Sequence, residues 1–286
     1  MSSVAARYAK LVALPHTVFA LPFAVGAAAI AWRHGAVPFS LARLVLIVVA
    51  VAAARTAAMA FNRVADRRFD AANPRTAARE LPRGAVSLRG AIAVTVAASL
   101  LFVAAAALLG TWPLLLSPVA LFILLGYSLA KRFTWATHLW LGVSLGGAPA
   151  GAWIAVTNDF GWAPLALSLA VACWVAGFDI IYATQDVEFD RGRRLGSIPA
   201  RFGVARALGI SRALHIAAVA GLIAFGVLLH LGFIYGAGVA VIALTLAYEQ
   251  RMVSPNDLSR VGKAFFDLNG YVSLAFAACA IVEALR

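Results

Sequence analysis

Long apolar runs constrain this chain more than any other feature of its sequence. A helix that crosses a bilayer needs about 20 mostly apolar residues, and the sequence contains nine runs of this kind: 11–32, 40–61, 88–109, 112–130, 134–157, 160–182, 208–229, 232–249 and 264–285. With 63% hydrophobic and 13% charged residues, the 286-residue chain is too apolar for an ordinary soluble domain. The sequence therefore predicts an all-α integral membrane protein, in which nine transmembrane helices form a bundle and residues 1–286 form a single domain.

The basic residues are distributed unevenly between the connections. Of the 24 lysines and arginines, all but Arg33, Arg43, Arg55 and Arg286 lie before the first run, in alternate connections or at the run ends beside them. Because connections rich in Lys and Arg stay in the cytoplasm, we expect a multi-pass protein of the inner (plasma) membrane with a cytoplasmic N-terminus and a central cavity open to the cytoplasm. This topology and anionic lipids explain the net charge of +12, so the charge does not indicate nucleic-acid binding.

A polar motif follows the second apolar run, and a related motif follows the sixth. Asn62, Asp66 and Asp70 are spaced four residues apart, so they lie on one face if the preceding helix continues through them. Asp186 and Asp190 repeat this step, and both acidic pairs are separated by the same interval, 186 − 66 = 190 − 70 = 120. Since the interval crosses an even number of predicted helices, the sequence predicts two pseudo-repeated halves in parallel orientation.

Two ionisable residues lie deeper in the apolar runs. Arg55 precedes Asn62 by seven residues, and Asp179 precedes Asp186 by seven. A charge at this depth is costly in a membrane and indicates a functional role by default. We expect Arg55 and Asp179 to face each other or a shared polar ligand, and we expect a single helix to carry Asp179 through Asp190 along one face.

Basic, polar connections follow both acidic pairs. The segments at about 63–87 and 187–206 are too long for simple helix hairpins, and loops of this length often cover binding sites. We interpret both as cytoplasmic lid loops, with Arg193 and Ser197 in the second. Lys131 and Arg132, at the end of the fourth run, are further candidate phosphate donors.

The charges around the acidic pairs indicate a diphosphate site. Magnesium in proteins is commonly held by one or two carboxylates together with phosphate oxygens, whereas this chain offers four carboxylates and many cations. A diphosphate would bridge metal ions to Lys131, Arg132 and the loop arginines and so balance both charges. At the mouth of an apolar bundle, the natural substrate is an isoprenoid diphosphate, whose departure leaves an allylic carbocation for a nucleophile.

The motifs resemble those of the UbiA prenyltransferase superfamily over nearly the whole chain. The resemblance rests on Asn62-x-x-x-Asp66-x-x-x-Asp70, Tyr182-Ala183 before Asp186-x-x-x-Asp190, Gly196 and Gly203, and Tyr127 with Lys131-Arg132. It implies two Mg2+ ions held through Asn62, Asp66, Asp70, Asp186 and Asp190, of which the four aspartates are the catalytic candidates. The candidate substrate-binding residues are Arg55, Asn62, Arg63, Tyr127, Lys131, Arg132, Asp179, Tyr182, Arg193 and Ser197.

Two branches of the superfamily are similar to this sequence. Segments 75–82 and 182–190 resemble the 4-hydroxybenzoate polyprenyltransferases and also their relatives that prenylate 1,4-dihydroxy-6-naphthoate in the futalosine route to menaquinone. Gln185, Glu188 and residues 199–201 depart from the ubiquinone enzymes, so both acceptors stay open. The resemblance implies magnesium-dependent prenyl transfer to an aromatic ring carbon, with Arg55 holding the acceptor carboxylate and Asp186 or Asp190 accepting a phenolic proton.

Two other classes of membrane protein use comparable residues. A transporter could use the buried Arg55 and Asp179 as a substrate or proton site. A CDP-alcohol phosphotransferase also combines magnesium with membrane aspartates, but it concentrates them in one extended motif. The division of the acids between two halves of this chain therefore disfavours the second class.

Overall fold

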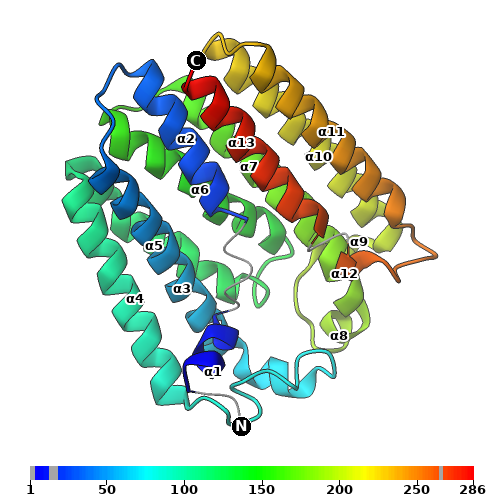
Figure 1. Cartoon of the computed structure of the whole chain (residues 1–286). Helices are drawn as coiled ribbons and strands as arrows, with labels where there is room; N and C mark the ends of the chain where they lie inside the picture. The colour runs from blue at the N-terminus through cyan, green and yellow to red at the C-terminus, as the bar shows by residue number, and fades with distance from the viewer. Residues whose placement is uncertain (1–3, 13–18, 264–266) are drawn as a thin grey trace.

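Helices are the regular elements of the computed structural model, which describes residues 4–12, 19–263 and 267–286 (Figure 1). No strand forms among these residues. In chain order the elements are α1 (Val4–Leu11), α2 (Leu21–His34), α3 (Leu41–Ala72), α4 (Leu88–Leu109), α5 (Thr111–Ala130), α6 (Thr137–Thr157), α7 (Trp162–Ala183), a 3₁₀ turn (Thr184–Asp186), α8 (Val187–Gly192), α9 (Ile198–Phe202), α10 (Val204–Leu228), α11 (Phe233–Met252), α12 (Val261–Lys263) and α13 (Asn269–Ala284).

Seven spans in the described part of the chain are long and apolar enough to cross a membrane, which confirms a multi-pass, all-α membrane protein. They are α3, α4, α5, α6, α7 continued through α8, α10 and α11. The helices α2, with 14 residues, and α13, with 16, are shorter than a span of about 20 residues. The predicted runs 11–32 and 264–285 include residues 13–18 and 264–266, which lie outside the described residues.

Helix α3 is longer than the apolar run that predicts it. It continues beyond residue 61 to Ala72 and therefore carries the whole segment from Asn62 to Asp70 on a regular helix. The helix ends where Asn73 takes an extended conformation, with φ −94° and ψ 118°. A residue before proline is disfavoured in helical geometry, and Pro74 follows directly. The first part of the predicted lid segment is thus helical, and only 73–87 forms the connection.

The second acidic pair does not lie on one continuous helix, contrary to the sequence expectation. Helix α7 ends at Ala183, Asp186 closes a 3₁₀ turn, and Asp190 lies on the short helix α8. The side chain of Asn73 from the first connection donates to Asp186 at this break. Long-range contacts of this kind select the local conformation at a helix end, and the four-residue spacing alone does not reveal them.

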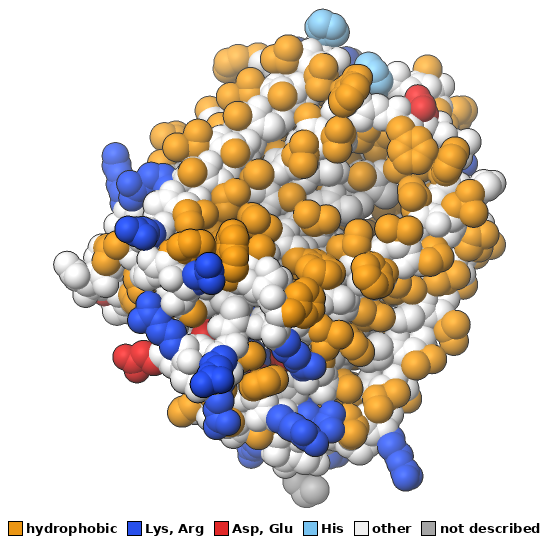
Figure 2. All heavy atoms as spheres, turned by 180° about the vertical axis from the view of Figure 1, so that it is seen from behind, with side chains coloured by type: hydrophobic (Ala, Val, Ile, Leu, Met, Phe, Trp, Pro, Cys, Tyr) orange, Lys and Arg blue, Asp and Glu red, His pale blue; other side chains and the backbone are white. Residues whose placement is uncertain are grey.

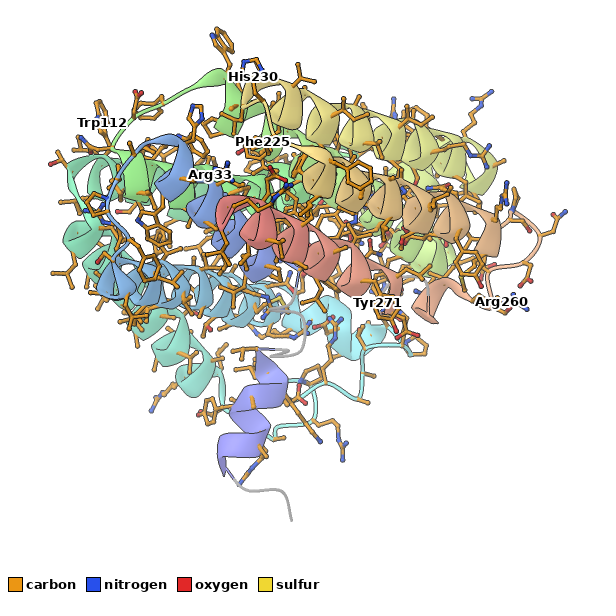
Figure 3. The ribbon with its side chains drawn as sticks, turned by 45° about the horizontal axis from the view of Figure 1, so that its top comes forward. Arg33, Trp112, Phe225, His230, Arg260 and Tyr271 are labelled. Carbon is orange, nitrogen blue, oxygen red and sulfur yellow. The ribbon has the colours of Figure 1, made fainter. Side chains whose placement is uncertain are left out.

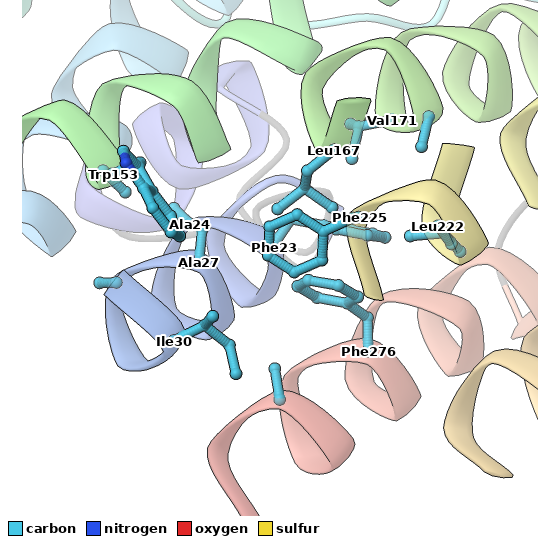
Figure 4. Packing of buried hydrophobic residues seen from close by; sticks show 14 of the residues in the cluster. Phe23, Ala24, Ala27, Ile30, Trp153, Leu167, Val171, Leu222, Phe225 and Phe276 are labelled. Carbon is cyan, nitrogen blue, oxygen red and sulfur yellow. The ribbon is translucent and has the colours of Figure 1, made fainter. Parts of the chain in front are cut away.

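Helix α7 is the central element of the bundle, where it packs against α6 and α10 (Figure 1). The apolar core lies beside it. Phe23 of α2 stacks on Phe276 of α13 with ring centroids 4.4 Å apart (Figure 4). The ring centroid of Phe23 also lies 5.1 Å from that of Trp174 on α7. These rings join the shorter helices α2 and α13 to α7.

Surface residues separate by type along the bundle. Many large apolar side chains are exposed, and on the face in Figure 2 they cover the middle of the molecule, while the Lys and Arg side chains gather toward one end. Figure 3 places Trp112 and His230 near the opposite end from Arg260. An exposed apolar band with cations at one end is the surface expected of a protein embedded in a bilayer.

Two glycines allow α6 and α7 to approach closely. A Cβ atom on Gly142 would lie 2.2 Å from the carbonyl oxygen of Ala172, and one on Gly146 would lie 2.5 Å from that of Ser168. Gly147, on the same helix, would meet nothing within 4 Å. Small residues at such crossings are the ordinary device for packing helices in membranes.

We predict that Gly142→Ala destabilises the protein by about 1–3 kcal/mol, because the added methyl group must push α6 away from the α7 backbone. Gly147→Ala is the matched control on the same helix and should unfold at the wild-type temperature. Thermal unfolding of both variants in detergent measures the difference. Equal melting temperatures would show that the crossing tolerates a methyl group.

Candidate functional site

A charged cavity of about 150 Å³ lies where both acidic motifs end. Five aspartates line it: Asp66, Asp70, Asp179, Asp186 and Asp190. Asn62, Tyr127, Lys131, Arg132 and Tyr182 are also in the lining. The fold thus brings together motif residues that are 120 positions apart in the chain.

The first motif is held by cations from two other parts of the chain. Asn62 donates to Asp66 across 3.0 Å, as expected for residues one turn apart. Arg132, just after α5, lies 3.4 Å from Asp66 and also donates to the Ala65 carbonyl at 2.7 Å. Arg79 of the 73–87 connection pairs with the buried Asp70 at 2.7 Å. Each carboxylate of this motif therefore has a cationic partner.

The second motif is held in the same way. Arg75 forms a bidentate salt bridge with Asp186, in which Nε of Arg75 lies 2.9 Å from Oδ1 of Asp186 and Nη2 contacts Oδ2. The Asn73 amide donates to the same Oδ1 at 3.0 Å. Lys131 lies 3.3 Å from Asp190, whose side chain is almost fully buried. The acidic turn after α7 is therefore tied to the connection that follows α3.

The local turn at Asn73 positions Arg75. The Asn73 side-chain oxygen accepts the backbone N–H of Arg75 at 3.0 Å, a common turn geometry for asparagine. Arg75 then reaches Tyr182, donating to its hydroxyl at 2.8 Å and lying over its ring. Burial disfavours the charged guanidinium, but the hydrogen bonds to Asp186 and Tyr182 outweigh this effect and raise the pKa of Arg75.

The donor set of the cavity suits a hard divalent cation. Carboxylate and amide oxygens are the ligands that magnesium and calcium prefer, and the buried Oδ2 of Asp70 has no hydrogen-bond partner. Among the described residues, no three His, Cys, Asp or Glu side chains already surround one point. Since four of the aspartates are paired with Arg or Lys, an incoming metal ion would replace part of these contacts.

A second, larger cavity adjoins the charged one. Its volume is about 500 Å³, and apolar side chains form most of its lining. Five residues line both cavities: Asn62, Arg79, Tyr127, Asp179 and Tyr182. An amphipathic ligand could therefore place its charged end among the aspartates and its apolar part between α3, α5 and α6.

Arg55 and Asp179 do not contact each other directly, contrary to one form of the sequence expectation. Arg55 donates to the Val12 carbonyl at 3.3 Å, whereas Asp179 contacts Nδ1 of His138 at 2.7 Å. Both residues line the apolar cavity, as does Arg63. They do not form an ion pair with each other. That both contact one polar ligand stays a prediction.

Two predicted site residues lie outside both cavities. Arg193 is exposed and lies over the ring of Phe189, which does line the charged cavity. Ser197 is fully buried and caps α9 by accepting the Ala200 N–H at 3.3 Å.

The second connection approaches the end of α5 closely at Gly196. The backbone N–H of Gly196 donates to the Lys131 carbonyl at 2.6 Å, and a Cβ atom on Gly196 would collide with the Thr134 carbonyl. This close approach fixes the second connection beside α5.

Four lining residues whose side chains contact an aspartate carboxylate were not among the predicted site residues: Asn73, Arg75, Arg79 and His138. The arginines were visible as part of a basic loop, but spacing in a loop does not give side-chain positions. His138 had a usable signal, because a buried carboxylate such as Asp179 requires a hydrogen-bond partner. Its position at the start of α6 gave no helical register that linked it to α7.

Comparison with known families and proteins gives a consistent result. The UbiA prenyltransferase family matches residues 19–274. The chain is 31% identical to the 4-hydroxybenzoate octaprenyltransferase of Nitrosospira multiformis over 234 residues, which is 82% of this chain and 80% of that protein. It is 29% identical to the 4-hydroxybenzoate octaprenyltransferase of Pseudoalteromonas translucida, covering 86% and 83% of the two chains.

Solved structures share the fold. The apo structure of a UbiA homologue from Aeropyrum pernix superposes with a TM-score of 0.85 at 42% identity, covering 93% of this chain and 97% of that one. A UbiA homologue from Archaeoglobus fulgidus bound to GPP and Mg2+ superposes with a TM-score of 0.71 at 22% identity, covering 96% and 99%. The resemblance found from the two motifs is thereby confirmed at the level of sequence and fold.

We predict that Arg75→Gln loosens the 73–87 connection, because the buried Asp186 loses its charged partner at a cost of about 1–3 kcal/mol. Backbone amides of this connection should exchange faster with deuterium in metal-free buffer. Arg83→Gln changes an exposed arginine in the same connection and serves as the control. Unchanged exchange in Arg75→Gln would mean that the Asp186 contact does not hold the connection in place.

Proposed function

Because the chain belongs to the UbiA prenyltransferase family, and is thus a prenyl-transferring enzyme of the membrane, we propose that it transfers a polyprenyl group to a ring carbon of an aromatic acid in quinone biosynthesis. The proposed acceptor is 4-hydroxybenzoate. The observation that carries the proposal is the continuity of a small charged cavity with a larger apolar one through five shared residues. A prenyl diphosphate has the same division between a charged head and an apolar tail.

The named relatives support the acceptor and the donor separately. The relatives from Nitrosospira multiformis and Pseudoalteromonas translucida are 4-hydroxybenzoate octaprenyltransferases. The homologue from Archaeoglobus fulgidus was solved with GPP and Mg2+, and also with DMAPP and Mg2+. We extend the donor chemistry to this chain on the basis of its own carboxylates and cations.

In the proposed complex the diphosphate lies among the cations that now hold the aspartates. Arg75, Arg79, Lys131 and Arg132 all line the charged cavity, and guanidinium and ammonium groups form strong hydrogen bonds with phosphate oxygens. Asn62, Asp66, Asp70, Asp186 and Asp190 would hold Mg2+, which supplies positive charge that favours departure of the diphosphate. Tyr127 and Tyr182 border the junction with the apolar cavity, where the reactive end of the prenyl group would lie.

The acceptor carboxylate is assigned to Arg55, with Arg63 beside it. Both arginines line the mainly apolar cavity, and Arg63 is 8% exposed. The carboxylate of an aromatic acid bound here would take the place of the Val12 carbonyl, which accepts a hydrogen bond from Arg55. The membrane interior makes such a pair stronger than it is in water, because the effective dielectric constant is lower.

We also propose the membrane arrangement that the charges favour. The cavity opens to the cytoplasm of a cell with this protein in its inner membrane, and α2 and α13 cross the bilayer with the seven longer spans, giving nine in all. The connections at about 63–87 and 187–206 act as lids, with Arg193 and Ser197 in the second. Cysteine labelling of residues in 73–87 and near His230 from either side of sealed vesicles tests this orientation.

Replacing Asp66 or Asp186 with Ala should abolish prenyl transfer, because each variant removes a proposed metal ligand from the charged cavity. Incubation of purified protein with geranyl diphosphate, Mg2+ and 4-hydroxybenzoate, followed by mass spectrometry, measures the product. Asp159→Ala, on the exposed turn between α6 and α7, is the control and should keep its activity. Chelation of the metal should stop the wild-type reaction, and added Mg2+ should restore it. Full turnover by either cavity variant would contradict the metal assignment.

Arg55→Gln should lower kcat/KM for 4-hydroxybenzoate by about 10- to 100-fold, since a charge-assisted hydrogen bond contributes roughly 1.5–3 kcal/mol. The same change should have little effect on 4-hydroxybenzamide, which carries no charge. Arg68→Gln alters an exposed arginine on the same helix and should affect neither acceptor. Equal losses for both acceptors would show that Arg55 does not recognise the carboxylate.

The wild-type protein also tests the two alternative functions. Higher activity with 1,4-dihydroxy-6-naphthoate than with 4-hydroxybenzoate would place the enzyme in the menaquinone branch. Transport of a substrate without any prenylated product would indicate a transporter.

A further inference from the structure

One aspartate of the charged cavity differs from the other four in its partner. Asp66, Asp70, Asp186 and Asp190 are paired with Arg132, Arg79, Arg75 and Lys131 in turn. Asp179 also lines the cavity, but no Lys or Arg of the described chain lies within 4.0 Å of its carboxylate. Its partner is the imidazole of His138. Four of the five aspartates are therefore paired with Arg or Lys, and Asp179 is paired with a histidine.

The contact with His138 orients Asp179. Nδ1 of His138 lies 2.7 Å from Oδ2 of Asp179. The histidine side chain is 1% exposed and the aspartate side chain is 17% exposed. The imidazole is therefore fixed by its surroundings, while the carboxylate keeps access to the cavity. With Nδ1–H donating to Oδ2, the remaining oxygen of Asp179 is available to a ligand.

The position of Asp179 also separates it from the other acids. Among the aspartates that the structure describes, it alone lines both the charged and the apolar cavity. Ser128 and Thr137 line the charged cavity as well, and their buried hydroxyl oxygens have no hydrogen-bond partner in the described structure. Buried polar atoms normally have partners, so these two hydroxyl groups still have the capacity to bond with a polar group.

We propose that Asp179 is the base that accepts the proton lost from the aromatic acceptor, and that His138 is a positioning residue that aims it. The proposal rests on the proposed function. As the C–O bond of the prenyl diphosphate breaks, its electron pair leaves with the diphosphate. A ring carbon then bonds to the prenyl carbon, the ring C–H bond breaks, and its electron pair restores the aromatic ring. The proton passes to the free oxygen of Asp179.

Asp179 suits this step better than Asp186 or Asp190, the candidates from the sequence. A carboxylate whose oxygens contact a guanidinium or an ammonium group is less open to an incoming ring C–H. Asp186 and Asp190 have such partners and are needed at the diphosphate. The base must instead stand at the boundary of the two cavities, where the diphosphate, the prenyl carbon and the ring meet. Asp179 occupies that boundary.

The central test is Asp179→Asn, which keeps the size and the polarity of the side chain but removes the base. We expect formation of prenylated aromatic product to fall on the order of 10²-fold or more, as for loss of a general base. Metal-dependent release of diphosphate, with capture of the prenyl cation by water, should stay within a few fold of wild type. The residual aromatic reaction should become slower with an acceptor deuterated at the attacked ring position. Asp159→Asn is the matched control.

A pair of His138 variants tests the positioning role. His138→Asn keeps an N–H near the position of Nδ1, so it should retain most of the aromatic product and show little isotope effect. His138→Leu fills the space without a donor. It should therefore yield more prenyl alcohol and less prenylated aromatic product than wild type, with the same isotope effect as Asp179→Asn. Equal behaviour of the two variants would remove the positioning role. Melting temperatures of all variants are measured alongside to check that each is folded.

The outcomes separate this inference from the proposed function. If wild-type protein makes no prenylated aromatic product from any phenolic acid, the proposed function itself is wrong. If wild type is active and Asp179→Asn loses diphosphate release and aromatic product equally, Asp179 acts before ring attack and the base assignment is overturned. Normal product formation by Asp179→Asn, with no isotope effect, would overturn it as well.

Discussion

The requirement to neutralise buried carboxylates at the end of a membrane bundle organises this protein. An uncompensated charge in a low-dielectric region costs several kcal/mol. Asp70, Asp186 and Asp190 are each less than 9% exposed, and each has a cationic partner from another segment. Because those partners come from the 73–87 connection and the end of α5, neutralising the acids also ties together α3, α5, α7 and their connections.

The same contacts give the proposed site its chemical character. In the proposed complex, metal ions would bind the carboxylates, and the cations that now pair with the aspartates would bind the diphosphate. The apolar cavity adjoins the charged one and shares five lining residues with it, so an isoprenoid chain can extend from a fixed head group. Asp179, whose partner is a histidine and not a Lys or Arg, lies at the boundary of the two cavities. In the proposed mechanism, the aspartates paired with cations hold the charged head group, and Asp179 takes the proton.

The accuracy of the sequence interpretation follows the range of the interactions involved. Apolar runs predicted α4 and α5 almost to the residue, because hydrophobicity over 20 residues is a local property. The length of α3 was missed, since the boundary depended on the absence of a helix breaker before Pro74 and not on hydrophobicity. The break between α7 and α8 was missed because Asn73 and Arg75, more than 100 positions away, hold Asp186 in place. His138 was overlooked for the same reason.

The sequence by itself determined the membrane environment, the family and the two acidic motifs that meet at the charged cavity. These properties follow from composition and from spacing along single helices, where side chains four residues apart share a face. Only the tertiary structure decided which cation meets which carboxylate, which helix end is broken and which aspartate of the charged cavity pairs with a histidine and with no Lys or Arg of the described chain. Such pairings depend on the three-dimensional approach of distant segments, and the cost of an unpaired buried group selects among them in a way that no local pattern encodes.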